Sequence, residues 1–178
     1  MILRETDLVA RRYIPKWNSR KGIKIMANTG DNSKAALVEA LNGALADHLA
    51  LYLKTKNFHW HVSGPRFRSL HLMFDEQAGE LFGLVDTIAE RVRKIGEKTL
   101  TGLGSVSKAT NIADQDDINL APEKMIEELR DDNVKLLERL KTVKQTSEDA
   151  GDNATNGMVD DWIDQTEERI WFLSETIN

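Results

Sequence analysis

The sequence contains no cysteine. A chain without thiols forms no disulfides, zinc–thiolate sites or iron–sulfur clusters, and it has no thiol nucleophile. Any bound metal ion must therefore be held by histidine, aspartate or glutamate. Long apolar runs are also missing, since no stretch approaches the roughly 18 uninterrupted apolar residues that a membrane helix needs, and no apolar segment follows the N-terminal charges. We expect a soluble, cytoplasmic protein without a membrane partner.

The 178 residues suffice for one domain with its own core and are too few for a second full domain. Charge is spread unevenly along the chain, whose overall net charge is -5. Residues 1–26 hold seven of the 24 bases and two of the 29 acids, a net of +5, which leaves 17 bases and 27 acids, a net of -10, in residues 27–178. Only the N-terminal segment is therefore expected to attract nucleic acid.

Residues 1–32 show no sustained helical or strand period and mix bases with glycine and asparagine. We interpret them as a mobile basic arm preceding one domain at residues 33–178. Met26 is an alternative start, which would remove residues 1–25.

Two long helices are predicted in the first half of this domain. Apolar residues recur at spacings of three and four from Ser33, a plausible N-cap, to about His61, where Ser, Gly and Pro at 63–65 end the helix. The second helix should run over residues 67–95 and end at Gly96.

The second half begins with a long connection at residues 97–121, rich in Gly, Asn and Asp, with one short helix near residues 105–110. Pro122 opens a third helix, and residues 147–157 are expected to break it. A fourth helix then carries the apolar residues Met158, Val159, Trp162, Ile163, Ile170, Trp171, Leu173 and Ile177. Four helices with one long crossover between the second and third indicate an all-α, ferritin-like four-helix bundle.

The chain has four histidines, and three of them cluster around the junction of the first two helices. His48 lies among the leucines of the first helix, which favours a hydrogen-bonded core residue over a metal ligand. His61 is either a ligand or a polar residue at the helix end. His59 and His71 flank the junction.

Four residues of ligand type share one face of the second helix: His71, Asp75, Asp86 and Glu90. At about 100° per residue they project at roughly 0°, 40°, 60° and 100°, whereas Glu76 and Glu80 point further round, as on a solvated face. Either pair alone would be ordinary surface residues one turn apart. Two pairs on one stripe favour a site for iron or another divalent ion, because such ions accept histidine together with carboxylates.

The spacing of the two pairs excludes a single site within one chain. Asp75 and Asp86 are eleven residues apart, about 16 Å along a helix. If two copies of the helix pack antiparallel across a twofold axis, Asp86 and Glu90 of one copy lie opposite His71 and Asp75 of the other. Conventional ferritins build their di-iron site inside one bundle with Glu-x-x-His motifs, and the sequence contains no such motif.

The motifs along residues 33–178 resemble those of the Dps family, the DNA-binding proteins from starved cells, or mini-ferritins. They are Asn57-Phe58-His59-Trp60, Gly64, Phe67, Leu70-His71, Phe74-Asp75-Glu76, Asp86-Thr87-Ile88-Ala89-Glu90-Arg91 and Trp171-Phe172-Leu173. The resemblance implies that His59, His71 and Asp75 of one subunit bind iron together with Asp86 and Glu90 of its neighbour.

The resemblance also implies a function: a bacterial ferroxidase with a di-iron site at the subunit interface. The enzyme would oxidise Fe(II), preferably with hydrogen peroxide, store ferric mineral inside a dodecameric shell built from twofold dimers, and protect DNA from oxidative damage. Trp60 is then an electron donor near iron, a packing residue at an interface, or both. The acidic loop with Glu148, Asp149 and Asp152 is a candidate entry pore.

Two other functions remain open from the sequence. In the first, the chain is mainly a DNA-compacting nucleoid protein, because twelve +5 arms on one shell would make many weak, salt-dependent phosphate contacts. In the second, the metal site is inactive and the bundle serves as an interaction scaffold. The intact set of five ligands argues against this second alternative.

Overall fold

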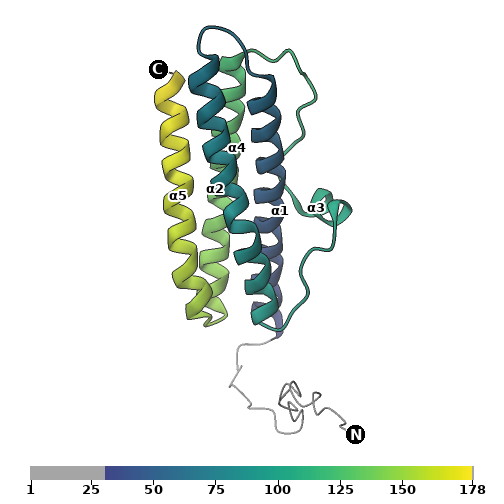
Figure 1. Ribbon diagram of the computed structural model, residues 1–178. Helices are drawn as coiled ribbons and strands as arrows, with labels where there is room; N and C mark the ends of the chain where they lie inside the picture. The colour runs from purple at the N-terminus through teal and green to yellow at the C-terminus, as the bar shows by residue number, and fades with distance from the viewer. Residues whose placement is uncertain (1–30, 178) are drawn as a thin grey trace, which may run out of the picture.

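The computed structural model describes residues 31–177, which form five helices and, within that range, no strand. The helices are α1 (Asp31–His61), α2 (Phe67–Lys94), α3 (Leu103–Ala109), α4 (Pro122–Asp149) and α5 (Asn153–Ile177). The four long helices lie side by side, and the crossover that carries α3 runs back along α1, so that α4 is parallel to α2 (Figure 1). The predicted all-α, ferritin-like bundle with one long crossover is confirmed.

The first helix begins two residues earlier than predicted. It starts at Asp31, so Ser33 lies inside the first turn instead of capping it. The remainder of the predicted basic arm, residues 1–30, lies outside the described residues. At the other end, Gly64 adopts a φ of 94° in the short turn that reverses the chain into α2. This turn brings the last residues of α1 beside the first residues of α2.

Glycines in the left-handed conformation end two of the helices. After α2, Gly96 has a φ of 90° and its N–H donates to the carbonyl oxygen of Arg93, while the N–H of Glu97 donates to the carbonyl oxygen of Val92. These two hydrogen bonds satisfy carbonyl groups that the last turn of the helix leaves free. Gly151, with a φ of 65°, ends α4 in the same way, because its N–H donates a hydrogen bond to the carbonyl oxygen of Glu148.

The predicted break at residues 147–157 is wrong in extent, because α4 continues to Asp149 and α5 begins at Asn153. Only residues 150–152 interrupt the helices. The left-handed Gly151 turns the chain, and the Asp152 carboxylate accepts a hydrogen bond from the Thr155 N–H, which caps the new helix at once.

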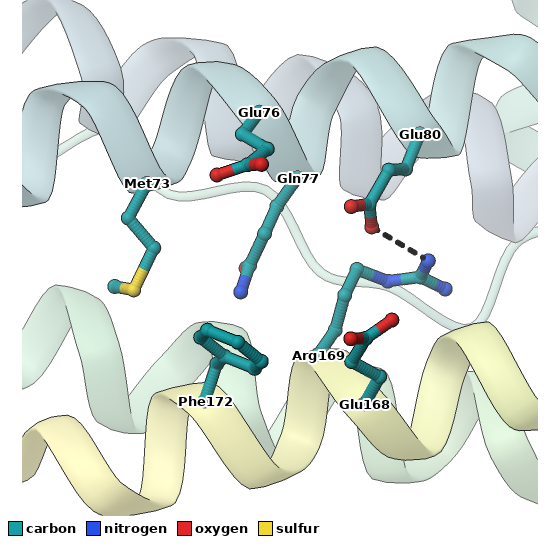
Figure 2. A pocket seen from close by; sticks show the side chains of 7 residues that line it. All are labelled: Met73, Glu76, Gln77, Glu80, Glu168, Arg169 and Phe172. Atoms are coloured by element: carbon teal, nitrogen blue, oxygen red, sulfur yellow. Dashed lines mark hydrogen bonds and ion pairs between the residues drawn. The ribbon is translucent and has the colours of Figure 1, made fainter.

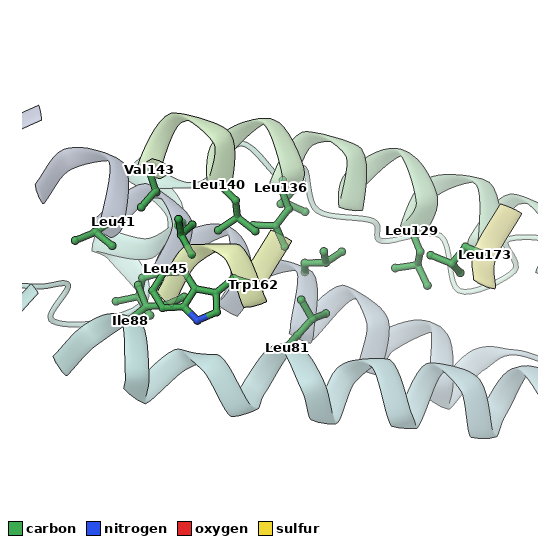
Figure 3. Close-up of a cluster of buried hydrophobic side chains, with 14 of the residues drawn as sticks. Leu41, Leu45, Leu81, Ile88, Leu129, Leu136, Leu140, Val143, Trp162 and Leu173 are labelled. Atoms are coloured by element: carbon green, nitrogen blue, oxygen red, sulfur yellow. The ribbon is translucent and has the colours of Figure 1, made fainter. Parts of the chain in front are cut away.

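The core is a continuous apolar cluster between the four long helices. Leucines and isoleucines from α1, α2 and α4 surround Trp162 of α5 (Figure 3). Trp171, predicted on the apolar face of the last helix, lies on the surface instead, since it is 59% exposed. Trp171 lies two residues before the buried Leu173, about 200° around the helix, and therefore points outward.

A buried carboxylate fastens the crossover to the bundle. Asp47, fully buried on α1, accepts hydrogen bonds from Arg139 Nε at 2.9 Å, Thr110 Oγ1 at 2.8 Å and the Asn111 N–H at 2.6 Å. These three donors come from α4 and from the part of the crossover that directly follows α3, so one side chain holds α1, the crossover and α4 together. No helix among residues 31–177 is both long and apolar enough to span a bilayer.

Candidate metal centre

Two histidines face each other where α1 ends and α2 begins. The rings of His59 and His71 stack with centroids 3.8 Å apart and planes 21° apart. His59 Nδ1 lies 2.7 Å from the His71 carbonyl oxygen, and His71 Nδ1 lies 2.8 Å from the His59 carbonyl oxygen. A carbonyl oxygen only accepts hydrogen bonds, so both Nδ1 atoms carry a hydrogen, and in the neutral form of each ring Nε2 keeps the lone pair that could bind a metal ion. Histidines that ligate metals are oriented by the same kind of hydrogen bond.

A carboxylate lies beside this pair. Asp75 follows His71 by one turn of α2, and its Oδ1 is 3.9 Å from His59 Nε2. Lys56 Nζ lies 2.6 Å from the same oxygen. The hydrogen bond and charge of Lys56 lower the pKa of Asp75 below its usual value, with smaller contributions from the two histidines. The carboxylate is thus ionised and available to a cation, which must compete with the Lys56 ammonium for it.

Sequence reasoning missed Lys56 as part of this group. The available signal was its position three residues before His59, which places both side chains on one face of α1. Phe67, one of the motif residues, also belongs to this group, because the centroid of its ring lies 5.0 Å from that of His71.

The other two predicted ligands lie further along α2, exposed to solvent. Glu90 forms an ion pair with Lys94 at 2.9 Å, and Asp86 has no hydrogen-bond or ion-pair partner in residues 31–177. No contact joins either residue to His59, His71 or Asp75. In the described part of the chain, no three His, Asp or Glu side chains are grouped closely enough to hold a metal ion. One chain thus carries two separate groups of predicted ligands, which we call the histidine half (His59, His71 and Asp75) and the carboxylate half (Asp86 and Glu90).

The remaining histidines do not join either half. His48 is completely buried, as predicted for a core residue, with Nδ1 2.7 Å from the Ala44 carbonyl oxygen. Burial lowers its pKa to about 4, so the ring is neutral at pH 7. His61 is exposed, with Nδ1 2.8 Å from the Asn57 carbonyl oxygen. Trp60, between His59 and His61, is 59% exposed on the isolated subunit.

Two acidic residues differ from the sequence interpretation. Glu80 is not merely solvated, because it pairs with the buried Arg169 of α5 at 3.4 Å. Asp152 is not free to line a pore, since Arg91 Nη2 lies 2.6 and 2.7 Å from its two oxygens and the carboxylate also caps α5. Burial, the largest single influence, favours a raised pKa of Asp152, but the hydrogen bonds from Arg91 and Thr155 together with the charge of Arg91 outweigh it and hold the pKa below its usual value. Glu148 and Asp149 of the predicted pore remain exposed.

Comparison with known proteins gives a consistent assignment. Residues 38–178 match the ferritin-like domain family. The DNA protection during starvation protein of Brevibacillus brevis is 35% identical over 133 residues, which is 75% of this chain and 89% of that protein. A low-temperature-induced protein of Nostoc is 32% identical over 149 residues, 83% of each chain.

Solved structures agree in fold. A Dps protein from Bacillus brevis superposes with a TM-score of 0.79 at 30% identity, covering 84% of this chain and 99% of that chain. Dps from Thermosynechococcus elongatus gives a TM-score of 0.80 at 26% identity, covering 83% and 93%. Dps from Vibrio cholerae, described as a member of a broad superfamily of ferritin-like diiron-carboxylate proteins, gives 0.78 at 25% identity, covering 83% and 92%. The chain therefore belongs to the Dps family of ferritin-like proteins.

Proposed function

We propose that the protein is a ferroxidase and iron-storage protein whose substrate, Fe(II), binds between two subunits. The observation that carries the proposal is the His59–His71 pair, with both Nδ1–H groups on carbonyl oxygens and both Nε2 lone pairs free beside the ionised Asp75. Neutral imidazole with carboxylate is a donor set that suits ferrous iron. The diiron-carboxylate description of the Vibrio cholerae relative supports the same chemistry.

The two halves of the centre are completed by a second copy of the chain. An antiparallel pair of α2 helices about a twofold axis places Asp86 and Glu90 of each copy opposite the histidine half of the other. Support for this contact comes from large apolar side chains on α1 and α2 that a single subunit leaves exposed: Leu53, Trp60, Phe67, Leu72 and Phe82, between 46% and 59% exposed. Exposed apolar residues of this kind mark an association surface. We propose that these dimers assemble further into a dodecameric shell.

The proposed reaction oxidises two ferrous ions with one hydrogen peroxide. Each Fe(II) gives one electron, the O–O bond breaks, and two protons convert the reduced oxygens into two waters, leaving two Fe(III). Because both electrons leave together, hydroxyl radical is not released. The carboxylates of Asp75, Asp86 and Glu90 favour the more highly charged Fe(III) product, and few protein ligands per ion leave room for peroxide. The acidic body of the subunit then suits the storage of ferric mineral inside the shell.

DNA protection is the second element of the proposal. The Brevibacillus brevis relative is named a DNA protection during starvation protein. Removing Fe(II) and peroxide protects DNA chemically, without contact. Direct DNA compaction is the alternative function. It would depend on the basic arm, whose residues 1–26 carry a net charge of +5, and the support for this alternative comes from the sequence alone.

Anaerobic iron loading followed by peroxide tests the proposal. We expect about one peroxide consumed per two Fe(II), a rise in ferric absorbance, and suppression of hydroxyl radical in a spin-trapping assay. His71→Ala should abolish the rapid oxidation of Fe(II) by peroxide, while His61→Ala, a matched change at an exposed histidine, should keep it. Rapid oxidation by air with no response to peroxide would contradict the proposed oxidant, and equal activity of the two variants would contradict the site.

A further inference from the structure

A small cavity opens between α2 and α5, on the face of α2 that does not carry the proposed ligands. Its volume is about 70 Å³. It is lined by Met73, Glu76, Gln77 and Glu80 of α2 and by Glu168, Arg169 and Phe172 of α5 (Figure 2). Counted from His71 at about 100° per residue, the α2 acids lie at roughly 140° and 180°, whereas the four proposed α2 ligands span 0° to 100°. The cavity is therefore separate from the proposed iron centre.

Gln77 is the unusual member of this lining. It is only 5% exposed, and its amide makes no hydrogen bond to any residue in the range 31–177. Its side chain extends from α2 toward α5, into the space between the two helices (Figure 2). The amide atoms are not sealed from the cavity, since Gln77 is absent from the buried polar atoms that lack a partner in the described chain, so a ligand or water in the cavity can hydrogen-bond to them.

The charges around the cavity select a cation. Glu76, Glu80 and Glu168 contribute three carboxylates, against one guanidinium from Arg169. That guanidinium already has partners within the protein: it donates hydrogen bonds to Asn133 at 3.0 Å and Thr166 at 2.8 Å, and it forms the ion pair with Glu80 at 3.4 Å. Glu76 and Glu168 have no hydrogen-bond or ion-pair partner among the described residues. An anion would meet an excess of negative charge here.

We propose that this cavity binds a partly hydrated divalent cation through Glu76, Glu168 and the amide oxygen of Gln77. These are hard oxygen donors, which suit Mg²⁺, Mn²⁺ or Fe²⁺. The three carboxylates are not grouped closely enough to enclose a bare ion. The cavity has room for a few waters, and a cation that keeps part of its hydration shell fits both facts. The ion would bridge α2 and α5, two helices that pack less closely than the other neighbouring long helices.

Manganese binding to the full-length protein tests this site. The background is a variant with His71→Ala and Asp75→Ala, in which the proposed iron centre is already removed, so the readout does not depend on ferroxidase activity. Bound Mn²⁺ is counted from the electron paramagnetic resonance signal of the free ion. Adding Glu76→Gln with Glu168→Gln should remove about one Mn²⁺ per subunit. Gln77→Leu, which leaves the charge unchanged, should weaken that binding about tenfold.

The matched control is Glu167→Gln with Glu175→Gln, which removes the same charge from exposed positions on α5 and should keep the ion. A crystal of the unsubstituted protein soaked in Mn²⁺ gives a second readout, an anomalous signal between Glu76 and Glu168. Equal Mn²⁺ counts in all variants, or only water in the cavity of the soaked crystal, would overturn the proposal. Either result leaves the proposed iron centre untouched, and loss of ferroxidase activity in other variants leaves this site untouched.

Discussion

The buried histidine in the core makes the stability of the subunit depend on pH in a calculable way. His48 is fully buried on α1, its Nε2 has no hydrogen-bond partner in the described residues, and burial, with a smaller contribution from Arg169, lowers its pKa to about 4. In the unfolded chain the same imidazole has a pKa near 6.5. Below pH 6.5 the unfolded state therefore binds a proton that the folded state does not bind until about pH 4.

This difference lowers the free energy of unfolding as the pH falls, and the loss can be worked out from the two pKa values. Above pH 7 both states hold neutral His48, so its titration contributes nothing. Linkage gives a loss of about 2 kcal/mol at pH 5 and about 3 kcal/mol at pH 4, where the dependence levels off.

We expect His48→Leu to remove this part of the acid sensitivity. Leucine fills similar space without a titrating nitrogen, so the variant should gain stability relative to the unsubstituted protein as the pH falls from 6.5 to 4. The measurement is chemical denaturation of metal-free protein at pH 7, 6, 5 and 4.5, at one protein concentration. His61→Leu, the matched change at the exposed histidine of α1, should keep the original acid sensitivity. Parallel stability curves for His48→Leu and the unsubstituted protein would refute the reasoning.

Three further changes test other parts of the structure. Asp47→Ala should destabilise the subunit by about 3–5 kcal/mol, because it leaves buried donors and Arg139 without their acceptor. The control, Asp160→Ala, removes the exposed ion pair with Lys144 and should cost below about 1 kcal/mol. Thermal unfolding measures both losses of stability, and equal losses would show that Asp47 is not a structural anchor. Lys56→Met should tighten anaerobic Fe(II) binding about two- to fivefold, since an ammonium group no longer competes for the carboxylate of Asp75. Calorimetry measures the affinity, and unchanged or weaker Fe(II) binding would contradict that competition. Removing residues 1–25 should abolish DNA binding at low salt in a gel-shift assay, because the remaining body is acidic, and unaltered binding would exclude the arm as the contact.

The periodicity of the sequence was enough to predict the bundle. Apolar spacing located all four long helices, and the glycines and prolines located most of their ends. The loop between α4 and α5 was predicted too long, because Asn153, Thr155 and Gly157 have low helix propensity. The capping carboxylate of Asp152 and the buried position of Thr155 outweigh that propensity.

The candidate site was predictable in part. Angular position on α2 identified His71, Asp75, Asp86 and Glu90 as one stripe, and the helical rise showed that they form two groups. The stacking of His59 on His71 was not predictable, because it depends on the geometry of the turn at Gly64. The pairing of Glu80 with Arg169 was also hidden, since the two residues lie 89 positions apart in sequence, on different helices.

The central claim is that each iron centre combines the histidine half of one subunit with the carboxylate half of another. Two inactive variants test it directly. One carries His71→Ala with Asp75→Ala, and the other carries Asp86→Ala with Glu90→Ala. A mixed dimer contains one complete centre, in which the intact histidine half of the second variant meets the intact carboxylate half of the first.

Ferroxidase activity of the co-assembled variants is the decisive measurement. Neither variant alone should show activity, and each verified mixed dimer should recover up to about half of the unsubstituted activity. With equal amounts and random pairing, half of the dimers are mixed, so the whole preparation should reach about one quarter. Absence of recovery in verified mixed dimers would mean that the centre lies within one chain, and it would contradict the shared-site account.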